Sequence, residues 1–209
     1  MPDVLEIAQK NFGKIVKTAT RLIQQGKVIV CPTDTVYGLM ADATNRQAIR
    51  KLFKIKKRQK NKPVPIFVKD LKMAKEFAKI DAKQERFLKS AWPGKITAVL
   101  KRKQTKTKLY GVDKKTIGLR IPRYGLVNEL LQKTNKPLSG TSANISGEPA
   151  STRIKEVIKQ FTPVRDKSLT GFKEQKWQPD LIIDAGNLKS PRPSGIVDLT
   201  GIEPKILRK

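Results

Sequence analysis

The stretch KVIVCPTDTVYG, residues 27–38, combines a short apolar segment with a polar loop. Residues 27–31 are rich in β-branched side chains, which favours a short buried strand. Residues 32–38 follow directly and carry hydroxyl, carboxylate and phenol groups. In open α/β sheets, ligands usually bind at the carboxyl ends of the strands. We therefore predict that this loop forms the polar lip of a pocket, with a turn or capping role for its Thr and Asp residues as the alternative.

Apolar spacing and breaker residues divide the rest of the chain into helices and strands. Helices are predicted at residues 4–25, 45–55, 71–78, 84–91, 126–134 and 153–161. Strands are predicted at residues 27–31, 63–68, 96–100, 116–121, 137–139, 181–184, 195–199 and 205–207. A hairpin or loop is predicted at 101–115 and a long loop at 139–152. Helices and strands alternate early and strands cluster late, which predicts an α/β fold with a sheet of mixed direction, in a single domain over residues 1–209.

Two residue types that often carry catalysis are scarce or missing. The chain has no histidine, which excludes Ser-His-Asp and Cys-His triads, the HExxH zinc helix and an imidazole general base. Cys31 is the single cysteine, so an internal disulfide and a multi-cysteine metal site are excluded and a reducing compartment fits. Apolar runs are short and acidic residues stand near the N-terminus, so we expect no secretory signal, no membrane contact and a cytoplasmic location.

Basic residues far outnumber acidic ones. The 209 residues include 45 Lys plus Arg and 18 Asp plus Glu, a formal net charge of +27. Such a charge attracts nucleic acids, nucleotides and acidic membrane surfaces. Lysine side chains on solvated faces that bind nothing would account for the same net charge equally well. The densest basic segment is residues 51–62, which contains seven basic residues and no acidic one.

Three polar clusters could bind a phosphorylated ligand, although the P-loop, the Rossmann glycine motif and the GxSxG nucleophile elbow are all absent. Residues 56–58, with Lys62, place guanidinium and ammonium groups at a helix end, where they suit a di- or triphosphate. Residues 139–147 offer hydroxyls, an amide and freely oriented backbone N–H groups. The loop at 32–38 is the third cluster. For each cluster alone, a solvated face or a simple turn is the alternative.

Five short motifs follow one another along the chain. They are PTDTVYG at 32–38, KxR at 56–58, WPG at 92–94, IGLRIP at 117–122 and SANxSG at 142–147. In this order and spacing they resemble the YrdC-like threonylcarbamoyl-AMP synthases, in the single-domain form of that family, and the similarity runs from about residue 10 to the C-terminus. The resemblance implies an open, twisted, mixed β-sheet with flanking helices and a basic concave face.

The resemblance also implies an activity. Members of the family are nucleotidyltransferases that join L-threonine, bicarbonate and ATP into L-threonylcarbamoyladenylate and release pyrophosphate. Other proteins then transfer the threonylcarbamoyl group to an adenosine of tRNA, which becomes N6-threonylcarbamoyladenosine. We therefore expect these three substrates, Mg²⁺ carried in with ATP, no protein-bound metal, and downstream threonylcarbamoyl-transferase proteins as partners. Whether tRNA contacts this chain directly is left open by the sequence.

Matched motif by motif, the resemblance assigns roles to individual residues. The catalytic set is Lys56, Arg58, Ser142 and Asn144. The ATP-binding set is Arg58, Lys62, Thr116, Ser142, Asn144, Thr152 and Arg208. The threonine-binding set is Thr35, Arg120 and Ser194, with Arg120 as partner of the amino acid's carboxylate. The chain departs from the family pattern at Gln59 and Lys95, which replace proline, and at Phe67, which replaces a histidine and removes one polar substrate contact.

A non-enzymatic RNA-binding protein is the alternative from a different class. Its basic concave face would hold a nucleic-acid backbone through the same net charge. Backbone binding alone does not require the hydroxyl and amide groups of Thr35, Ser142 and Asn144. Aromatic residues, which stack on bases, make up only 6% of the chain. The sequence therefore favours the enzyme.

Overall fold

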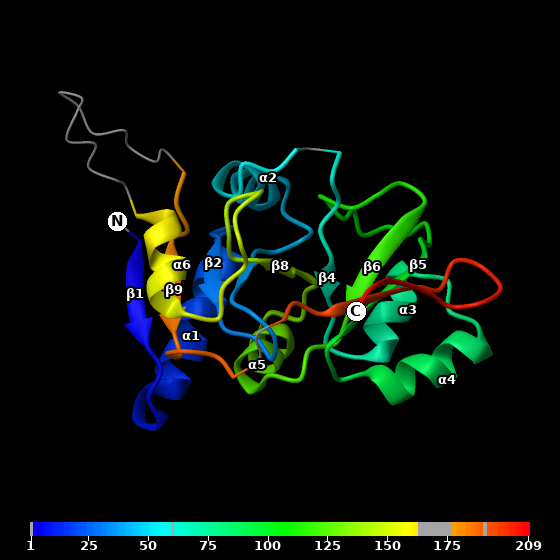
Figure 1. Cartoon of the computed structure of the whole chain (residues 1–209), viewed down its shortest axis with the longest axis horizontal. Helices are drawn as coiled ribbons and strands as arrows, with labels where there is room; N and C mark the ends of the chain where they lie inside the picture. Colours follow the sequence, from blue (N-terminus) through cyan, green and yellow to red (C-terminus); the bar gives the residue numbers. More distant parts are fainter. Residues whose placement is uncertain (1, 60, 163–176, 190–191) are drawn as a thin grey trace.

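The computed structural model describes residues 2–59, 61–162, 177–189 and 192–209, whose strands form two mixed sheets (Figure 1). The first sheet has the order β1 (Asp3–Glu6), β9 (Leu181–Asp184), β2 (Ile29–Cys31), β3 (Gly38–Met40) and β8 (Thr141–Ser142). The second has the order β11 (Lys205–Arg208), β10 (Gly195–Asp198), β5 (Ile96–Lys101), β6 (Thr116–Arg120), β4 (Ile66–Phe67) and β7 (Leu138–Ser139). Both contain parallel and antiparallel pairs, so the α/β class with mixed strand direction is confirmed.

The two sheets meet at one continuous segment, because only Gly140 separates β7 from β8. Asp42, just after β3, forms an isolated antiparallel bridge with Leu138 of β7. Gly140 lies against the ring of Phe67, and a Cβ atom at this glycine would stand 2.3 Å from Phe67 Cε1. A residue without a side chain is therefore needed where the chain passes from the second sheet to the first.

Helices cover both sheets (Figure 1). The α-helices of the described residues are α1 (Phe12–Gln24), α2 (Arg46–Ile55), α3 (Leu71–Phe77), α4 (Ala82–Ala91), α5 (Gly125–Thr134) and α6 (Ile154–Phe161). The start of α2 follows from its cap, since Asn45 Oδ1 accepts hydrogen bonds from the N–H groups of Gln47 and Ala48. None of the helices in this part of the chain is long and apolar enough to cross a lipid bilayer.

Alternate residues of β2 enter two different cores. Val28, just before the strand, and Val30 pack in a buried cluster with α2 and α6, whereas Ile29 and Cys31 pack in another with α1 and α5. A third cluster joins the second sheet to α3 and α4. Burial on both faces explains why this strand reads as an unbroken apolar run.

The N-terminal segment differs from the helix predicted over residues 4–25. Residues 3–6 form β1, which pairs in parallel with β9, and α1 begins only at Phe12. Leu5 and Ile7 fit the spacing of an amphipathic helix, but pairing with a strand about 180 residues away is decided by tertiary contact. The short strand β3 was not predicted, and β8 lies inside the predicted loop 139–152, because strands of two or three residues carry no readable period.

Candidate functional site

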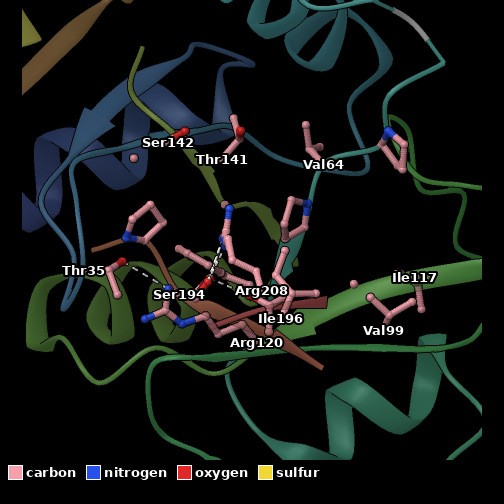
Figure 2. Close-up of a pocket in the computed structure, with 18 of the residues that line it drawn as sticks. Thr35, Val64, Val99, Ile117, Arg120, Thr141, Ser142, Ser194, Ile196 and Arg208 are labelled. Atoms are coloured by element: carbon pink, nitrogen blue, oxygen red, sulfur yellow. Dashed lines mark hydrogen bonds between the residues drawn. The ribbon is translucent and has the colours of Figure 1, made fainter. Parts of the chain in front are cut away.

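A cavity of about 350 Å³ opens where the two sheets meet, and both sheets contribute to its wall (Figure 2). The polar loop that follows β2 forms part of this wall, as the sequence predicts. The predicted site residues that line the cavity are Thr35, Arg58, Thr116, Arg120, Ser142, Ser194 and Arg208. The fold therefore gathers residues from both ends and the middle of the chain around one hollow.

Arg120, the last residue of β6, is 2% exposed and held from three sides. Its NH2 group forms an ion pair with Asp34 Oδ1 at 2.6 Å, and its NH1 group donates to Thr35 Oγ1 at 3.3 Å. Its Nε donates to the carbonyl of Gly94 at 2.8 Å. Asp34 also accepts from the backbone N–H of Arg123 at 3.0 Å. Burial lowers the pKa of Arg120 and Asp34 opposes this shift, so the guanidinium stays charged.

Buried hydroxyl groups lie beside this guanidinium in two pairs. Thr33 Oγ1 and Thr35 Oγ1 are 2.9 Å apart, and Thr97 Oγ1 and Ser194 Oγ are also 2.9 Å apart. Figure 2 shows Thr35, Arg120 and Ser194 directed toward the same region. A fixed cation with hydroxyl groups around it suits a small ligand that carries a carboxylate and further polar groups.

Arg58 reaches the cavity because α2 ends in a left-handed turn. Lys57 has a φ of 50°, and the N–H of Arg58 donates to the carbonyl of Phe53 at 2.9 Å, as in a Schellman motif. The Arg58 side chain donates from Nε to the carbonyl of Lys62 at 2.9 Å and from NH2 to the carbonyl of Pro63 at 2.8 Å. Partial burial lowers the pKa of Arg58, but a guanidinium remains charged. The helix end thus fixes a positive charge at the cavity wall.

Lys56 is buried behind the cavity wall, with 2% of its surface exposed. Its Nζ donates to the carbonyl of Ser142 and to Asn144 Oδ1, both at 2.7 Å, and to the carbonyl of Asn144 at 3.1 Å. Ser142 Oγ in turn donates to Asn144 Oδ1 at 2.6 Å. Burial lowers the pKa of Lys56 to about 7, and the charge of Arg58 acts in the same direction. Lys56 and Asn144 therefore set the position of Ser142, which does line the cavity.

Arg208 and Thr116 close the cavity on the side of the second sheet. Arg208, the last residue of β11, donates from Nε and NH2 to the carbonyl of Ser194 at 2.9 and 2.7 Å. Partial burial lowers the pKa of its guanidinium. Arg58, Arg120 and Arg208 therefore bring three arginine side chains to the cavity wall from separate parts of the chain.

Three predicted ATP contacts lie outside the cavity wall: Asn144, which holds Ser142, and also Lys62 and Thr152. The carbonyl of Lys62 accepts from Arg58 Nε, and the carbonyl of Thr152 accepts from the N–H of Leu188 at 2.9 Å. Of Lys62 and Thr152, only Lys62 forms a hydrogen bond with a residue of the wall among the described residues, through its backbone carbonyl. Residue 60, part of the basic segment 51–62, lies outside the described residues.

Sequence reasoning missed two polar residues of the cavity wall, Thr97 and Asp113. Thr97 is a single threonine in an otherwise apolar strand, and such a residue does not by itself indicate a binding site. Asp113 lies in the predicted loop 101–115, and its carboxylate has a lowered pKa because the N–H groups of Thr116 and Lys115 donate to Oδ1 at 2.9 and 2.8 Å. The sequence did carry a signal for Asp113, namely its DxxT spacing to Thr116. This spacing lets the carboxylate cap the start of β6.

Comparisons with known proteins show which family the chain resembles. The family model for Sua5, YciO and YrdC proteins, described as Telomere recombination, matches residues 21–209. A Methanocaldococcus jannaschii protein assigned as a threonylcarbamoyl-AMP synthase is 32% identical over 196 residues, which cover 94% of this chain and 86% of that protein. The threonylcarbamoyl-AMP synthase of Pyrococcus abyssi is 29% identical over 100% of this chain, which spans 57% of the length of that enzyme.

One solved structure extends the comparison to a bound molecule. The crystal structure of P. abyssi Sua5 complexed with L-threonine matches 100% of this chain and 57% of that chain, with a TM-score of 0.81 and 27% identity. The family model covers most of the chain, and the M. jannaschii relative exceeds 30% identity over nearly all of it. On this evidence the chain belongs to the Sua5/YciO/YrdC family.

Proposed function

We propose that this chain is an L-threonylcarbamoyladenylate synthase, a nucleotidyltransferase that makes threonylcarbamoyl-AMP and pyrophosphate from L-threonine, bicarbonate and ATP. One observation carries the proposal: Thr35, Arg120 and Ser194 line the same cavity as Arg58 and Ser142. Relatives named threonylcarbamoyl-AMP synthase in P. abyssi and Bacillus subtilis, and the P. abyssi complex with L-threonine, support it.

Arg120 is the proposed partner of the threonine carboxylate. A guanidinium has five N–H groups. The contacts to Asp34, Thr35 and Gly94 use three of them, which leaves two for a ligand. The ring of Phe67, with its centroid 5.6 Å from Arg120 Cζ, offers an apolar surface for the threonine methyl group. The hydroxyls of Thr35 and Ser194 complete the proposed threonine site.

Arg58, Arg208 and Ser142 are the proposed contacts of the ATP phosphates. Backbone carbonyls hold both arginine side chains at the wall, so each guanidinium is oriented before the nucleotide binds. Lys56 and Asn144 act through Ser142 as positioning residues. The further candidates from the family motifs are Lys62, Thr116 and Thr152, of which Thr116 lies on the cavity wall.

The proposed reaction needs no imidazole base. A neutral threonine amine gives a carbamate either with bicarbonate, which releases a water molecule, or with carbon dioxide, which releases a proton. A carbamate oxygen then attacks the α-phosphorus of ATP, the bond to the bridging oxygen breaks, and pyrophosphate leaves with that oxygen and its electron pair. The residues of the cavity hold the substrates in contact and stabilise the developing negative charge, which is a task for fixed arginine and hydroxyl groups.

Asp113 is the cavity residue that fits a Mg²⁺ ion carried in with ATP. Its carboxylate is held ionised by backbone N–H groups, and Mg²⁺ is commonly held by one or two carboxylates together with substrate phosphates. When bound, Mg²⁺ would neutralise part of the phosphate charge. In the part of the chain that the structure describes, no group of three His, Cys, Asp or Glu side chains is arranged to hold a metal ion.

The proposal extends to location and partners. The activated product needs an acceptor, so we propose that threonylcarbamoyl-transferase proteins consume it and that tRNA is the final recipient. A cytoplasmic location fits the single buried cysteine. The RNA-binding alternative has less support, because the named relatives carry an enzyme's name and the cavity combines cations with hydroxyls.

The test is to incubate purified protein with ATP, bicarbonate and labelled L-threonine. We expect labelled threonylcarbamoyl-AMP and an equimolar amount of pyrophosphate, each dependent on all three substrates. The RNA-binding alternative predicts no adenylate, a melting temperature that ATP and threonine leave unchanged, and RNA binding that falls steeply with salt.

A further inference from the structure

The central strand β5 presents two side chains to the cavity, Thr97 and Val99. The alternate residues Ala98 and Leu100 pack in the buried cluster between the second sheet and its helices, on the opposite face of the strand. Thr97 is 2% exposed, so its hydroxyl is hidden from bulk water. A buried hydroxyl needs a hydrogen-bond partner, and that partner indicates what the residue does.

The partner of Thr97 is Ser194, which directly precedes β10. The strand β10 runs parallel to β5, with Ile196 opposite Thr97. This register brings Thr97 Oγ1 to 2.9 Å from Ser194 Oγ, and both residues are buried. In the part of the chain that the structure describes, Ser194 is the hydrogen-bond partner of the Thr97 hydroxyl and no second one is present. The two hydroxyls therefore form a unit in the cavity wall.

Arg208 determines which side of the Ser194 hydroxyl carries the hydrogen. Its guanidinium holds the carbonyl of Ser194 from Nε and NH2, and NH2 also lies 3.5 Å from Ser194 Oγ (Figure 2). A fixed cation attracts the lone pairs of a hydroxyl oxygen and repels its hydrogen. Ser194 Oγ therefore turns a lone pair toward Arg208 and its hydrogen elsewhere.

The direction of the hydrogen bond between the two hydroxyls follows from counting donors and acceptors. Each hydroxyl has one hydrogen and two lone pairs. If Ser194 donated to Thr97, the hydrogen of Thr97 would be buried without an acceptor among the described residues, which costs free energy. If Thr97 donates to Ser194, the Ser194 oxygen accepts from Thr97 and faces Arg208, and its own hydrogen is free for a ligand.

A free hydroxyl hydrogen at this place suits a carboxylate. An ionised carboxylate only accepts hydrogen bonds, so a hydroxyl stabilises it only when the hydrogen points toward it. Hydrogen bonds to a charged group are also stronger than those between neutral groups. Arg120, the proposed partner of the threonine carboxylate, is directed toward the same region as Ser194 (Figure 2).

We infer that Thr97 is a positioning residue for the amino-acid site, which donates to Ser194 so that the Ser194 hydroxyl points its hydrogen at the carboxylate of bound threonine. The inference rests on the proposed function and adds to it a residue that acts through another. The hydroxyl of Thr97 should therefore matter for threonine binding, and it should matter only while the hydroxyl of Ser194 is present.

The test is direct binding of L-threonine, measured by isothermal titration calorimetry without ATP or bicarbonate. Thr97→Val removes the hydroxyl and keeps the branched shape, whereas Thr97→Ser keeps the hydroxyl. The control Thr134→Val removes a buried hydroxyl that donates to the carbonyl of Leu130 within α5, outside the cavity wall. We expect the Kd for threonine to rise about tenfold in Thr97→Val, and to change less than about threefold in Thr97→Ser and in the control.

Melting temperatures show whether each variant is folded. Thr97→Ala also lacks the hydroxyl, in a smaller side chain, and we expect the same rise in Kd. Equal affinity of the wild type and the variants without the hydroxyl overturns the inference. A wild type that binds no threonine contradicts the proposed amino-acid site itself, so the two failures are distinguishable.

A double-mutant cycle separates positioning from direct contact. Ser194→Ala removes the hydroxyl through which Thr97 acts. Adding Thr97→Val to this variant should therefore raise the Kd by less than about twofold more, because the two side chains act as one unit. A further tenfold rise would show that Thr97 acts independently of Ser194, which overturns the inference.

Discussion

Asp34 determines how Arg120 faces the cavity. The two form a buried ion pair, and the Asp34 carboxylate is itself fixed by the backbone N–H of Arg123. Removing one partner of a buried pair leaves an uncompensated charge, which typically costs about 3–5 kcal/mol. The guanidinium plane is therefore set before a ligand arrives, and lysine, a point charge on a flexible stem, cannot reproduce it.

The substitution Arg120→Lys tests this at the threonine site. We expect the KM for threonine to rise about 10–100-fold. The guanidinium can make two charged hydrogen bonds to the threonine carboxylate, whereas the lysine ammonium makes one. The KM for ATP should change less than about threefold, since Arg58 and Arg208 are untouched. Steady-state kinetics with each substrate varied in turn measure both values, and a larger effect on ATP than on threonine would contradict the assignment.

Lys56 makes the stability of the fold depend on pH. Burial lowers its pKa from the usual 10.5 to about 7, so between these values the unfolded chain binds more protons at Lys56 than the folded chain does. The free energy of unfolding must then rise with pH across this window. Relative to a Lys56→Met variant, the wild type should gain about 2–4 kcal/mol between pH 7 and about pH 10. Urea unfolding of both proteins measures the difference, and a constant difference would show that the pKa is not lowered.

At the scale of elements, the sequence predicted those elements whose signals are local. Asn45 caps α2 close to the predicted start, and the apolar run before Cys31 forms the strand that ends at the polar loop. Elements defined by a distant partner were missed, such as β1, which exists through its pairing with β9. The same distinction between local and long-range signals applies to the residues of the site. The motifs pointed to Arg58, Arg120 and Ser142 as ligand contacts, and the structure places all three on one cavity wall. The burial of Lys56 was not predictable, because it depends on contacts across 86 and 88 residues of sequence.

At the scale of elements, Gly140 is sensitive to substitution because it stands where the chain passes between the two sheets. In Gly140→Ala, the new Cβ would meet the Phe67 ring at 2.3 Å, so the ring or the crossing between the sheets must move. We expect a loss of about 1–3 kcal/mol in the free energy of unfolding, as overpacking of a core usually gives. Combining Gly140→Ala with Phe67→Leu should recover part of this loss.

Gly13→Ala is the matched control for this prediction. Gly13 lies in α1 with nothing within 4 Å of a new Cβ, so alanine there should leave stability unchanged or raise it by up to about 1 kcal/mol. Urea denaturation measures all of these variants. Equal stability of Gly140→Ala and the wild type would show that the Phe67 ring does not pack as described.

For the whole molecule, the net charge of +27 is the dominant property. The positive charges repel one another in the folded state and attract anions to the molecule. Both effects weaken as salt screens the charges. The basic concave face expected from the family remains a prediction, while the arginines around the cavity are part of the described site.

Salt should therefore stabilise the fold. Raising sodium chloride from about 50 mM to about 500 mM should increase the melting temperature by about 3–6 °C, because screening removes part of the self-repulsion. A variant with Lys14→Glu and Lys17→Glu, which lowers the net charge, should show a smaller increase. Differential scanning calorimetry measures both, and a melting temperature that falls with salt would mean that favourable ion pairs outweigh the repulsion.

In the proposed enzyme, one cavity binds ATP and threonine side by side. A crystal structure with L-threonine and a non-hydrolysable ATP analogue tests it most directly. We predict that the threonine carboxylate lies within hydrogen-bond distance of Arg120 and that phosphate oxygens contact Arg58 and Ser142. Threonine or nucleotide bound elsewhere on the molecule, with this cavity left to solvent, would contradict the account.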